Sequence, residues 1–422
     1  MIVTLISTIL LLFFLIKDYK KQFASPYFWL LIGYAFYFLP NLWSYILNSK
    51  YSILSKLEFV YYNNHVLIII IITLLFRKYL IFERLNSINS IRFLDQRLIR
   101  TITLGSLFIY FIGSVYQIGL SNYFNLNRAA TMVLKADQSG GLLLEGILAF
   151  SQIFFFIELH KMMYNKEPFK KYMFFYIVIL SIILFPTGAR GKLISVIFGL
   201  LFLLSYFKKI NPNKLILPGF FASIFFQLFG KIRHLTTDIS LIGPFLRDNF
   251  SWEMLNITKG GESVANVVSF IDVFNNGNII RPYGSRFYSI INSYELLIPK
   301  FITKRDFNGL NYWFVEKFYP EIFLAGGGKG FSLIAEGLII DQYIGSSILL
   351  ILCFLTIFLI KKLISINSSY SYFSQIFMCA ILLELFQLPR LTFAALLKAM
   401  IIFGFVPIIS VYVFNHTFKK KN

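Results

Sequence analysis

The chain has 422 residues, of which 57% are hydrophobic and only 14% are charged. A soluble domain carries roughly 25% charged residues, so this composition excludes a water-facing surface of ordinary size. The formal net charge of +20 does not indicate nucleic-acid binding, because the lysines and arginines cluster between long apolar runs, where the positive-inside rule places them. We expect a lipid bilayer around the chain and no nucleic-acid partner.

Apolar runs long enough to cross a bilayer recur along the chain. Crossing takes about 20 residues in a helix, and these runs are continuous rather than alternating, which favours helices over a barrel. The sequence therefore predicts an all-α integral membrane protein with about eleven transmembrane helices. The predicted spans are residues 2–16, 27–47, 58–76, 101–120, 140–160, 172–187, 191–207, 214–230, 331–360, 371–388 and 392–415.

Two of these spans need comment. The first lacks a basic region before it and a small-residue cleavage site, so we interpret it as a retained helix rather than a signal peptide. It is also short, and if it does not span, only the position of the N-terminus changes. The ninth is long enough to be tilted or interrupted.

The basic residues between spans predict the topology. Alternate connections hold 21 lysines and arginines, whereas the opposite short connections hold 7. The positive-inside rule makes the first set cytoplasmic, with the C-terminus inside and the N-terminus in the periplasm. The expected location is a bacterial inner membrane.

One long connection, residues 231–330, contains no apolar run of bilayer length. The alternation makes it extracytoplasmic, and we expect short helices within it. It divides the chain into transmembrane helices 1–8 (residues 1–230), a large periplasmic loop acting as a lid (231–330) and transmembrane helices 9–11 (331–422). The loop has 11 basic and 9 acidic residues, so it is not a polybasic lipid-binding patch.

The loop also contains one amphipathic helix. The apolar positions follow helical spacing, with Ser263, Asn266 and Ser269 off the stripe. The stripe residues are Val264, Val267, Val268, Ile271 and Phe274. Such a stripe packs on the helices beneath, or it lies in the outer leaflet beside a lipid substrate.

Ionisable residues inside a bilayer are costly and usually pair or line cavities. Here Glu145, Glu336, Asp341, Glu384 and Lys398 all fall in the outer parts of predicted spans. This bias predicts a water-filled basin that opens outward beneath the loop. The alternative is that each carboxylate pairs privately, for instance Glu384 with Arg390.

Two glycine-containing motifs lie at the outer face. The hairpin Thr187–Gly191 includes Arg190 and is followed by Lys192. Its backbone amides and the guanidinium suit an anion, although such an arginine is also a common snorkelling anchor. The second motif, Gly326–Ser332 with Lys329, leads into Glu336 and on to Asp341 and Gly345.

With these motifs the sequence resembles the family of O-antigen polymerases, the Wzy-type oligosaccharide repeat-unit polymerases, which are related to the O-antigen ligases. The resemblance rests on the Thr-Gly-x-Arg-Gly hairpin Thr187–Gly191, the large loop, and the Gly-Phe-Ser-x-Ile-Ala-Glu stretch Gly330–Glu336. It covers about half the chain. A tyrosine of the family pattern is missing, and Asp341 replaces an asparagine. The ligases carry a histidine where this chain has Gly330–Ser332, which favours a polymerase.

The resemblance implies a GT-C-like glycosyltransferase that inverts configuration without a metal or other cofactor. It would polymerise undecaprenyl-pyrophosphate-linked O-antigen or capsule repeat units at the outer face of the inner membrane. Fixed cations would stabilise the pyrophosphate leaving group, and a general base would activate the acceptor hydroxyl. A chain-length regulator and a flippase are possible partners.

The outward-facing residues provide candidates for both roles. For the general base we select His234, because of its titration range, and Glu336, if partial desolvation raises its pKa. The substrate-binding candidates are Arg190, Arg233, Arg281, Arg286, Lys192 and Lys329. No metal site is expected. The alternatives are an O-antigen ligase, a lipid-linked oligosaccharide flippase or transporter, and a membrane sensor or scaffold.

Overall fold

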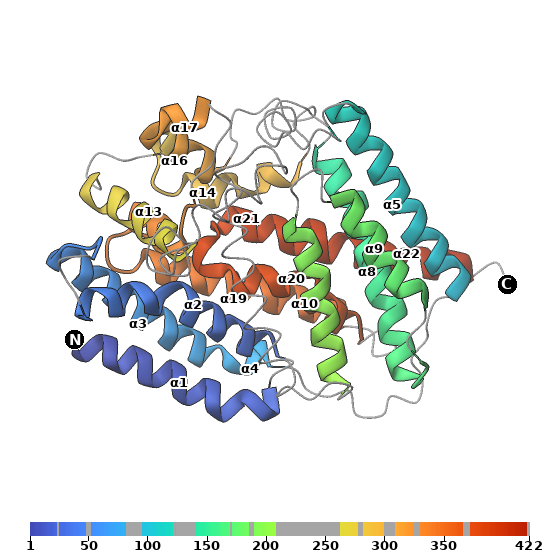
Figure 1. Cartoon of the computed structure of the whole chain (residues 1–422), viewed down its shortest axis with the longest axis horizontal. Coiled ribbons are helices and arrows are strands. Elements are labelled where there is room, and N and C mark those ends of the chain that lie inside the picture. The colour runs from blue at the N-terminus through green and yellow to red at the C-terminus, as the bar shows by residue number, and fades with distance from the viewer. Residues whose placement is uncertain are drawn as a thin grey trace, which may run out of the picture.

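A computed structural model describes most of the chain, and the described part is mostly helical. The described residues are 1–22, 25–47, 52–81, 95–120, 123, 141–168, 171–184, 190–207, 262–276, 282–298, 309–324, 330–365 and 372–419. Within these ranges no β-strand is present, which agrees with the continuous apolar runs of the sequence. Figure 1 shows the helices in chain order.

Seven described helices are long and apolar enough to cross a membrane, and three shorter apolar helices accompany them. The long ones are α1 (Ile2–Gln22), α2 (Pro26–Leu47), α3 (Lys56–Leu75), α5 (Gln96–Ile118), α8 (Gly141–Tyr164), α19 (Gly345–Ile364), and the continuous run of α21 (Phe393–Lys398), the π-helix η8 (Ala399–Phe405) and α22 (Val406–Lys419). The shorter ones are α9 (Lys171–Leu184), α10 (Arg190–Tyr206) and α20 (Tyr372–Phe386). The chain is thus a multi-pass, all-helical membrane protein. The predicted eighth span, 214–230, lies outside the described residues.

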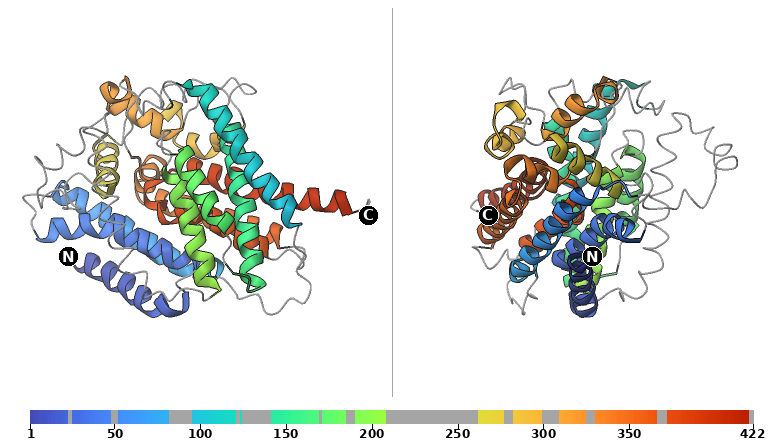
Figure 2. Two further views of the ribbon diagram at one scale, coloured as in Figure 1. Left: turned by 45° about the vertical axis from the view of Figure 1, so that its right-hand side comes forward. Right: turned by 90° about the vertical axis from the view of Figure 1, so that its left-hand side faces the viewer.

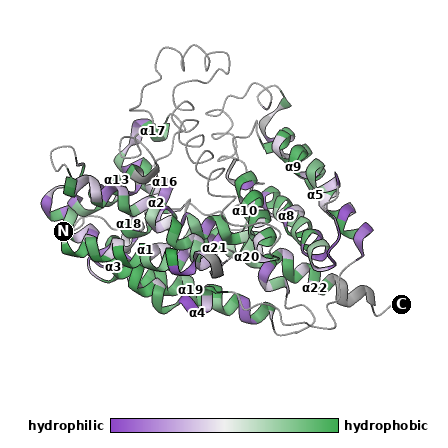
Figure 3. Ribbon diagram, turned by 60° about the horizontal axis from the view of Figure 1, so that its bottom comes forward, coloured by the Kyte–Doolittle hydropathy of each residue, from purple (hydrophilic) through white to green (hydrophobic). Residues whose placement is uncertain are grey.

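The outer faces of the long helices are apolar. α1 exposes Leu5, Ile9 and Phe13, and α5 exposes Phe108 and Ile112. Large exposed apolar surfaces on a soluble protein mark an interaction site, but here they run the length of the helices, which suits contact with lipid tails. Figure 3 shows the long helices mostly hydrophobic, with hydrophilic residues gathered near helix ends.

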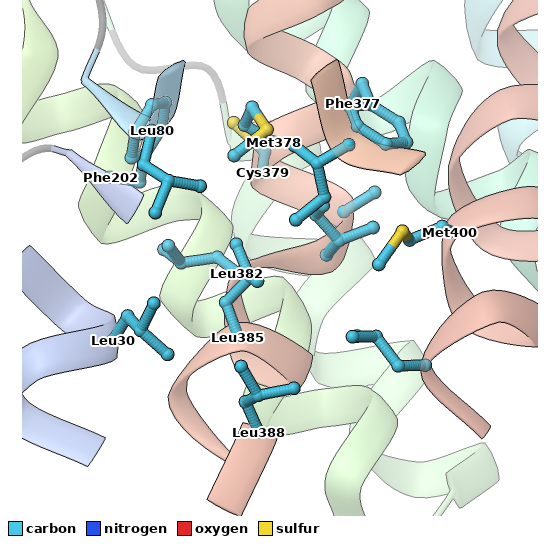
Figure 4. Close-up of a cluster of buried hydrophobic side chains, with 14 of the residues drawn as sticks. Leu30, Leu80, Phe202, Phe377, Met378, Cys379, Leu382, Leu385, Leu388 and Met400 are labelled. Atoms are coloured by element: carbon cyan, nitrogen blue, oxygen red, sulfur yellow. The ribbon is translucent and has the colours of Figure 1, made fainter. Parts of the chain in front are cut away.

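The core is built around α20, whose residues are buried on nearly every side. Leu382 and Leu385 lie between Leu30 of α2 and Met400 of η8 (Figure 4). Gly33 of α2 lets the backbones approach, because a Cβ there would meet the carbonyl group of Phe386. α20 therefore joins the N-terminal helices to α8, α10 and η8, which also pack against it.

Polar ties gather at one end of the helices, here called the basic end. Arg77 donates to the Asp18 carboxylate at 2.6 Å, which joins the short helix α4 (Arg77–Leu80) to α1. Arg100 of α5 pairs with the fully buried Glu158 of α8 at 2.8 Å. The ammonium of Lys361, near the end of α19, donates to the Tyr79 carbonyl at 2.7 Å. These ties fix the lateral order of the helices.

The opposite end, here called the loop end, carries the helices of the long connection. They are α13 (Glu262–Asn276), η4 (Pro282–Gly284), α14 (Tyr288–Ile291), η5 (Asn292–Leu297), α16 (Leu310–Phe318) and α17 (Pro320–Leu324). The yellow and orange helices lie together on one side of the molecule in Figure 1 and in both views of Figure 2. The predicted short helices of this segment are therefore present in its described part.

The helix α13 packs on the helices beneath it, which was one of the two readings of its apolar stripe. It contacts α2, α3 and α18 (Leu333–Ile340). The Ser269 hydroxyl donates to Ser332 at 3.1 Å, and the Asn275 amide donates to Glu58 at 2.9 Å. The predicted buried face is wrong in detail, because Asn266 and Ser269 are fully buried. Neighbours on two sides cover these small polar residues.

The predicted ninth span is interrupted. α18 ends at Ile340, Asp341 begins a turn, and α19 starts at Gly345. A helix of eight residues reaches about 12 Å, so α18 is too short to span and only α19 does. The two helices pack closely, because a Cβ on Gly337 would come within 2.6 Å of the Ser346 Cα.

This contact predicts that Gly337→Ala is destabilising. The added methyl meets backbone atoms, which cannot move aside as a flexible side chain does, and overpacking costs about 1–3 kcal/mol. Gly105→Ala is the matched control, because a Cβ on that helical glycine meets nothing within 4 Å. Reversible unfolding in mixed micelles should show a lower stability for Gly337→Ala only. Equal stability of the two variants would contradict the described packing.

Candidate functional site

Four ionisable side chains from four different helices meet near the loop end. They are Glu145 of α8, Lys192 of α10, Glu384 of α20 and Lys398 of α21. Electrostatic interactions connect Lys192 with each of the other three. We call these four residues the charge cluster. Each stands within a few residues of the helix end that faces the loop helices, so helix register places all four at one level.

The pair Lys398–Glu145 is the closest contact of the charge cluster. Its Nζ and Oε2 atoms are 2.6 Å apart, and the two side chains are 28% and 39% exposed. Lys398 is the last residue of α21, and the π-helix η8 follows it directly. π-helical turns frequently occur at functional sites. η8 packs on α8 and α20, so this turn lies next to the cluster.

Lys192 is held differently. Its ammonium lies over the ring of Phe403, 3.0 Å from the centroid, in a cation–π contact. Phe403 belongs to η8. The Lys192 backbone carbonyl accepts a hydrogen bond from Gln152 of α8 at 3.3 Å, which fixes the start of α10. Within the described part of the chain, the ammonium has no hydrogen-bond acceptor.

Glu384 stands beside Lys192, and the charge that acts on it is that of Lys192. Its Oε2 atom is buried and has no hydrogen-bond donor among the described residues. The private pairing of Glu384 with Arg390 that the sequence allowed is therefore not the arrangement found; Arg390 interacts instead with Tyr37. Of the five outer-half charges, Glu145, Glu384 and Lys398 interact with Lys192, whereas Glu336 and Asp341 have other contacts. The water-filled basin stays a prediction.

Tyr312 of α16 connects the charge cluster to the loop helices. It is exposed and interacts electrostatically with Glu145. η5 packs against α21, so loop-end helices lie close to the cluster on that side. Neither Tyr312 nor Phe403 was a sequence candidate, because an aromatic residue in an aromatic-rich chain gives no signal until its charged neighbours are known.

Glu336 lies elsewhere in the structure and is fully buried. Its Oε2 accepts a hydrogen bond of 2.7 Å from the backbone N–H of Phe393, so the carboxylate caps the first turn of α21. α18 is outside the spanning helices, and burial raises the pKa of the Glu336 carboxyl to about 7. Its role as a base stays a prediction. Its described contacts are the cap of α21 and an interaction with the Ser289 side chain.

Arg286 is exposed, just before α14, and interacts with Asp341. The backbone N–H groups of Ile344 and Tyr343 each donate to the Asp341 carboxylate at 2.9 Å. These hydrogen bonds hold the pKa of Asp341 below its usual range. The two residues therefore mark the turn between α18 and α19 at the loop end.

The other predicted site residues are only partly placed. Arg190 is the first residue of α10, two positions before Lys192. His234, Arg233, Arg281 and Lys329 lie outside the described residues. Across the described segments, no group of histidines, cysteines or carboxylates is arranged to hold a metal ion. Cys353 and Cys379 are buried and free.

Comparison of the chain with protein-family models, with curated proteins and with solved structures found no match.

The ion pair of the charge cluster gives a stability prediction. Lys398→Met and Glu145→Gln should each lower the free energy of unfolding, because each leaves one partly buried charge without its partner. The double variant should lose less than the sum, with a coupling of about 1 kcal/mol for residues in contact. A double-mutant cycle measured by reversible unfolding in micelles tests this. Additive losses would show that the two groups do not interact.

Proposed function

We propose that the chain is a membrane glycosyltransferase that polymerises undecaprenyl-pyrophosphate-linked repeat units, of O-antigen or capsule, at the outer face of a bacterial inner membrane. The observation that carries the proposal is the charge cluster. Charges cost free energy inside a bilayer and usually mark a functional site. Four of them, from four helices, lie near the loop end, which we assign to the membrane surface where a lipid carrier presents its head group.

The depth of the cluster favours an enzyme over a carrier. Transporters place their polar site near the midplane of the membrane, between repeated halves. Here Lys192 is the third residue of α10 and Glu384 the third from the end of α20. A site so close to the helix ends is reached from the loop end, which suits a reaction between two lipid-linked substrates at one membrane surface.

The transferred glycan leaves a pyrophosphate, and its developing charge needs fixed cations. Arg190 begins the helix that carries Lys192, two positions before it, and we assign that role to it. Arg233, Arg281, Arg286 and Lys329 are the further candidates on the loop. A planar guanidinium binds phosphate oxygens with two parallel hydrogen bonds, which makes the arginines better candidates than lysines for this group.

The proposed orientation places the loop end in the periplasm and the basic end in the cytoplasm. The basic end includes Arg77, Arg100 and Lys361, as the positive-inside rule requires of a cytoplasmic surface. The N-terminus would then be periplasmic and the C-terminus cytoplasmic. A chain-length regulator and a flippase would work beside the protein in the same membrane.

The proposed function predicts that the variant Lys192→Ala loses polymer formation. In a strain lacking the gene, this variant should restore less than about one hundredth of the wild-type polymer, since one electrostatic contact of an active site contributes roughly 10²–10³ in rate. Gel separation of the surface polysaccharide measures the ladder. Lys362→Ala, an exposed lysine at the end of α19, is the control and should restore a full ladder.

The same strain separates the alternatives by what accumulates without the gene. Single repeat units on the carrier, exposed on the periplasmic side, support a polymerase. Repeat units retained on the cytoplasmic side would indicate a flippase. Polymer of normal length that stays on the carrier would indicate a ligase.

The orientation predicts which engineered thiols react from outside. The two native cysteines are buried, so single exposed substitutions report cleanly. Leu324→Cys, at the loop end, should react with a membrane-impermeant maleimide in spheroplasts, whereas Lys362→Cys should react only after lysis. The opposite pattern would invert the proposed topology.

A further inference from the structure

The net charge of the charge cluster limits what it binds. Two ammonium groups, Lys192 and Lys398, face two carboxylates, Glu145 and Glu384, so the cluster is neutral when all four are ionised. A pyrophosphate brings at least two negative charges and would meet both carboxylates. A neutral cluster suits an uncharged polar ligand better.

The four charges of the cluster are held differently. Lys398 and Glu145 form an ion pair, with 2.6 Å between Nζ and Oε2. The Lys192 ammonium contacts the Phe403 ring and has no hydrogen-bond acceptor among the described residues. The Glu384 Oε2 atom is a buried acceptor without a donor in the same part of the chain. Leaving a buried polar group unpaired costs free energy. The two groups therefore favour a ligand that supplies both an acceptor and a donor.

A hydroxyl group has both functions, since its oxygen accepts and its O–H donates. Sugars present hydroxyls on neighbouring carbons, so one hydroxyl would accept from the ammonium while the next donates to the carboxylate. Phe403 holds the ammonium in place. The exposed Tyr312 stands on the loop side of the cluster, beside Glu145, where further sugars of the same chain would lie.

We propose that Lys192 and Glu384 form the acceptor-sugar subsite, in which Glu384 takes the proton of the attacking hydroxyl. This inference rests on the proposed function and specifies its acceptor side. As the acceptor O–H bond breaks, its oxygen bonds to the anomeric carbon of the growing chain. The bond from that carbon to the pyrophosphate breaks, and the electron pair leaves with the lipid pyrophosphate. The proton goes to the Glu384 carboxylate and then to solvent.

The proposal divides the roles of the charged residues. It leaves the carrier pyrophosphate to the arginines of the proposed function and gives the acceptor sugar to Lys192 and Glu384. Glu384 then acts as a catalytic residue, and Lys192 binds and orients the acceptor. Lys398 and Glu145 are positioning residues, because their ion pair links α21 and the π-helix η8 to α8.

The test uses the purified full chain in nanodiscs and the variant Glu384→Gln, which keeps the shape of the side chain but is not a base. Its turnover with lipid-linked repeat units should fall at least 100-fold. Binding of the repeat-unit oligosaccharide, released from its carrier by mild acid, should weaken about tenfold, as for a lost hydrogen bond to a charged group. Binding of undecaprenyl pyrophosphate should change less than twofold.

Two controls keep the result interpretable. Glu321→Gln, an exposed carboxylate of α17, should leave all three measurements unchanged. Formate added to Glu384→Ala should restore part of the turnover, which a purely structural role would not produce. If Glu384→Gln does not fold, the formate response of a folded Glu384→Ala decides the question.

The inference is overturned if Glu384→Gln turns over at the wild-type rate. It is also overturned if that variant loses binding of undecaprenyl pyrophosphate and keeps binding of the oligosaccharide. The proposed function fails separately. A wild-type protein that binds the oligosaccharide through Glu384 but forms no polymer supports the sugar subsite and refutes the polymerase.

Discussion

The structure depends on one electrostatic constraint: a charge among apolar helices must have a partner. At the basic end the chain meets it with the ties Asp18–Arg77 and Glu158–Arg100, each of which joins two helices. At the loop end Lys398–Glu145 is paired in the same way. The ties at both ends join helices. The loop end adds two further charges, Lys192 and Glu384, which we assign to a ligand.

The loop helices hold the helices of the loop end together. α13 is tied to α3 through Asn275 and Glu58, and to α18 through Ser269 and Ser332. The buried Glu336 of α18 caps the N-terminus of α21. Lys398 is the last residue of the same helix. A substitution at Glu336 removes this cap from α21. It can therefore move Lys398 of the charge cluster, although the Glu336 carboxylate itself contacts that helix only at its start. Loss of activity in such a variant would not by itself identify a base.

The sequence predicted most of the helices, because an apolar run of bilayer length is a local property. It allowed an interrupted ninth span but did not place the break after Ile340, since the close approach of Gly337 and Ser346 exists only once the two helices pack. Nor did it predict the burial of Asn266 and Ser269, which depends on neighbours from two directions. From the sequence, the cluster could be recognised only because Glu145, Glu384 and Lys398 fall at a similar depth in their predicted spans. Which of them pair depends on helix rotation, which a sequence pattern does not specify.

The position of α13 along the chain has a consequence for biosynthesis. Chains are made from the N-terminus, and domains assemble in that order. When residues 262–276 emerge, α2 and α3 are already in place and offer half of the docking surface, including Glu58. The other half, α18, is made later. α13 can therefore pack on α2 and α3 during synthesis. It gains its contact with α18 only when the last helices have inserted.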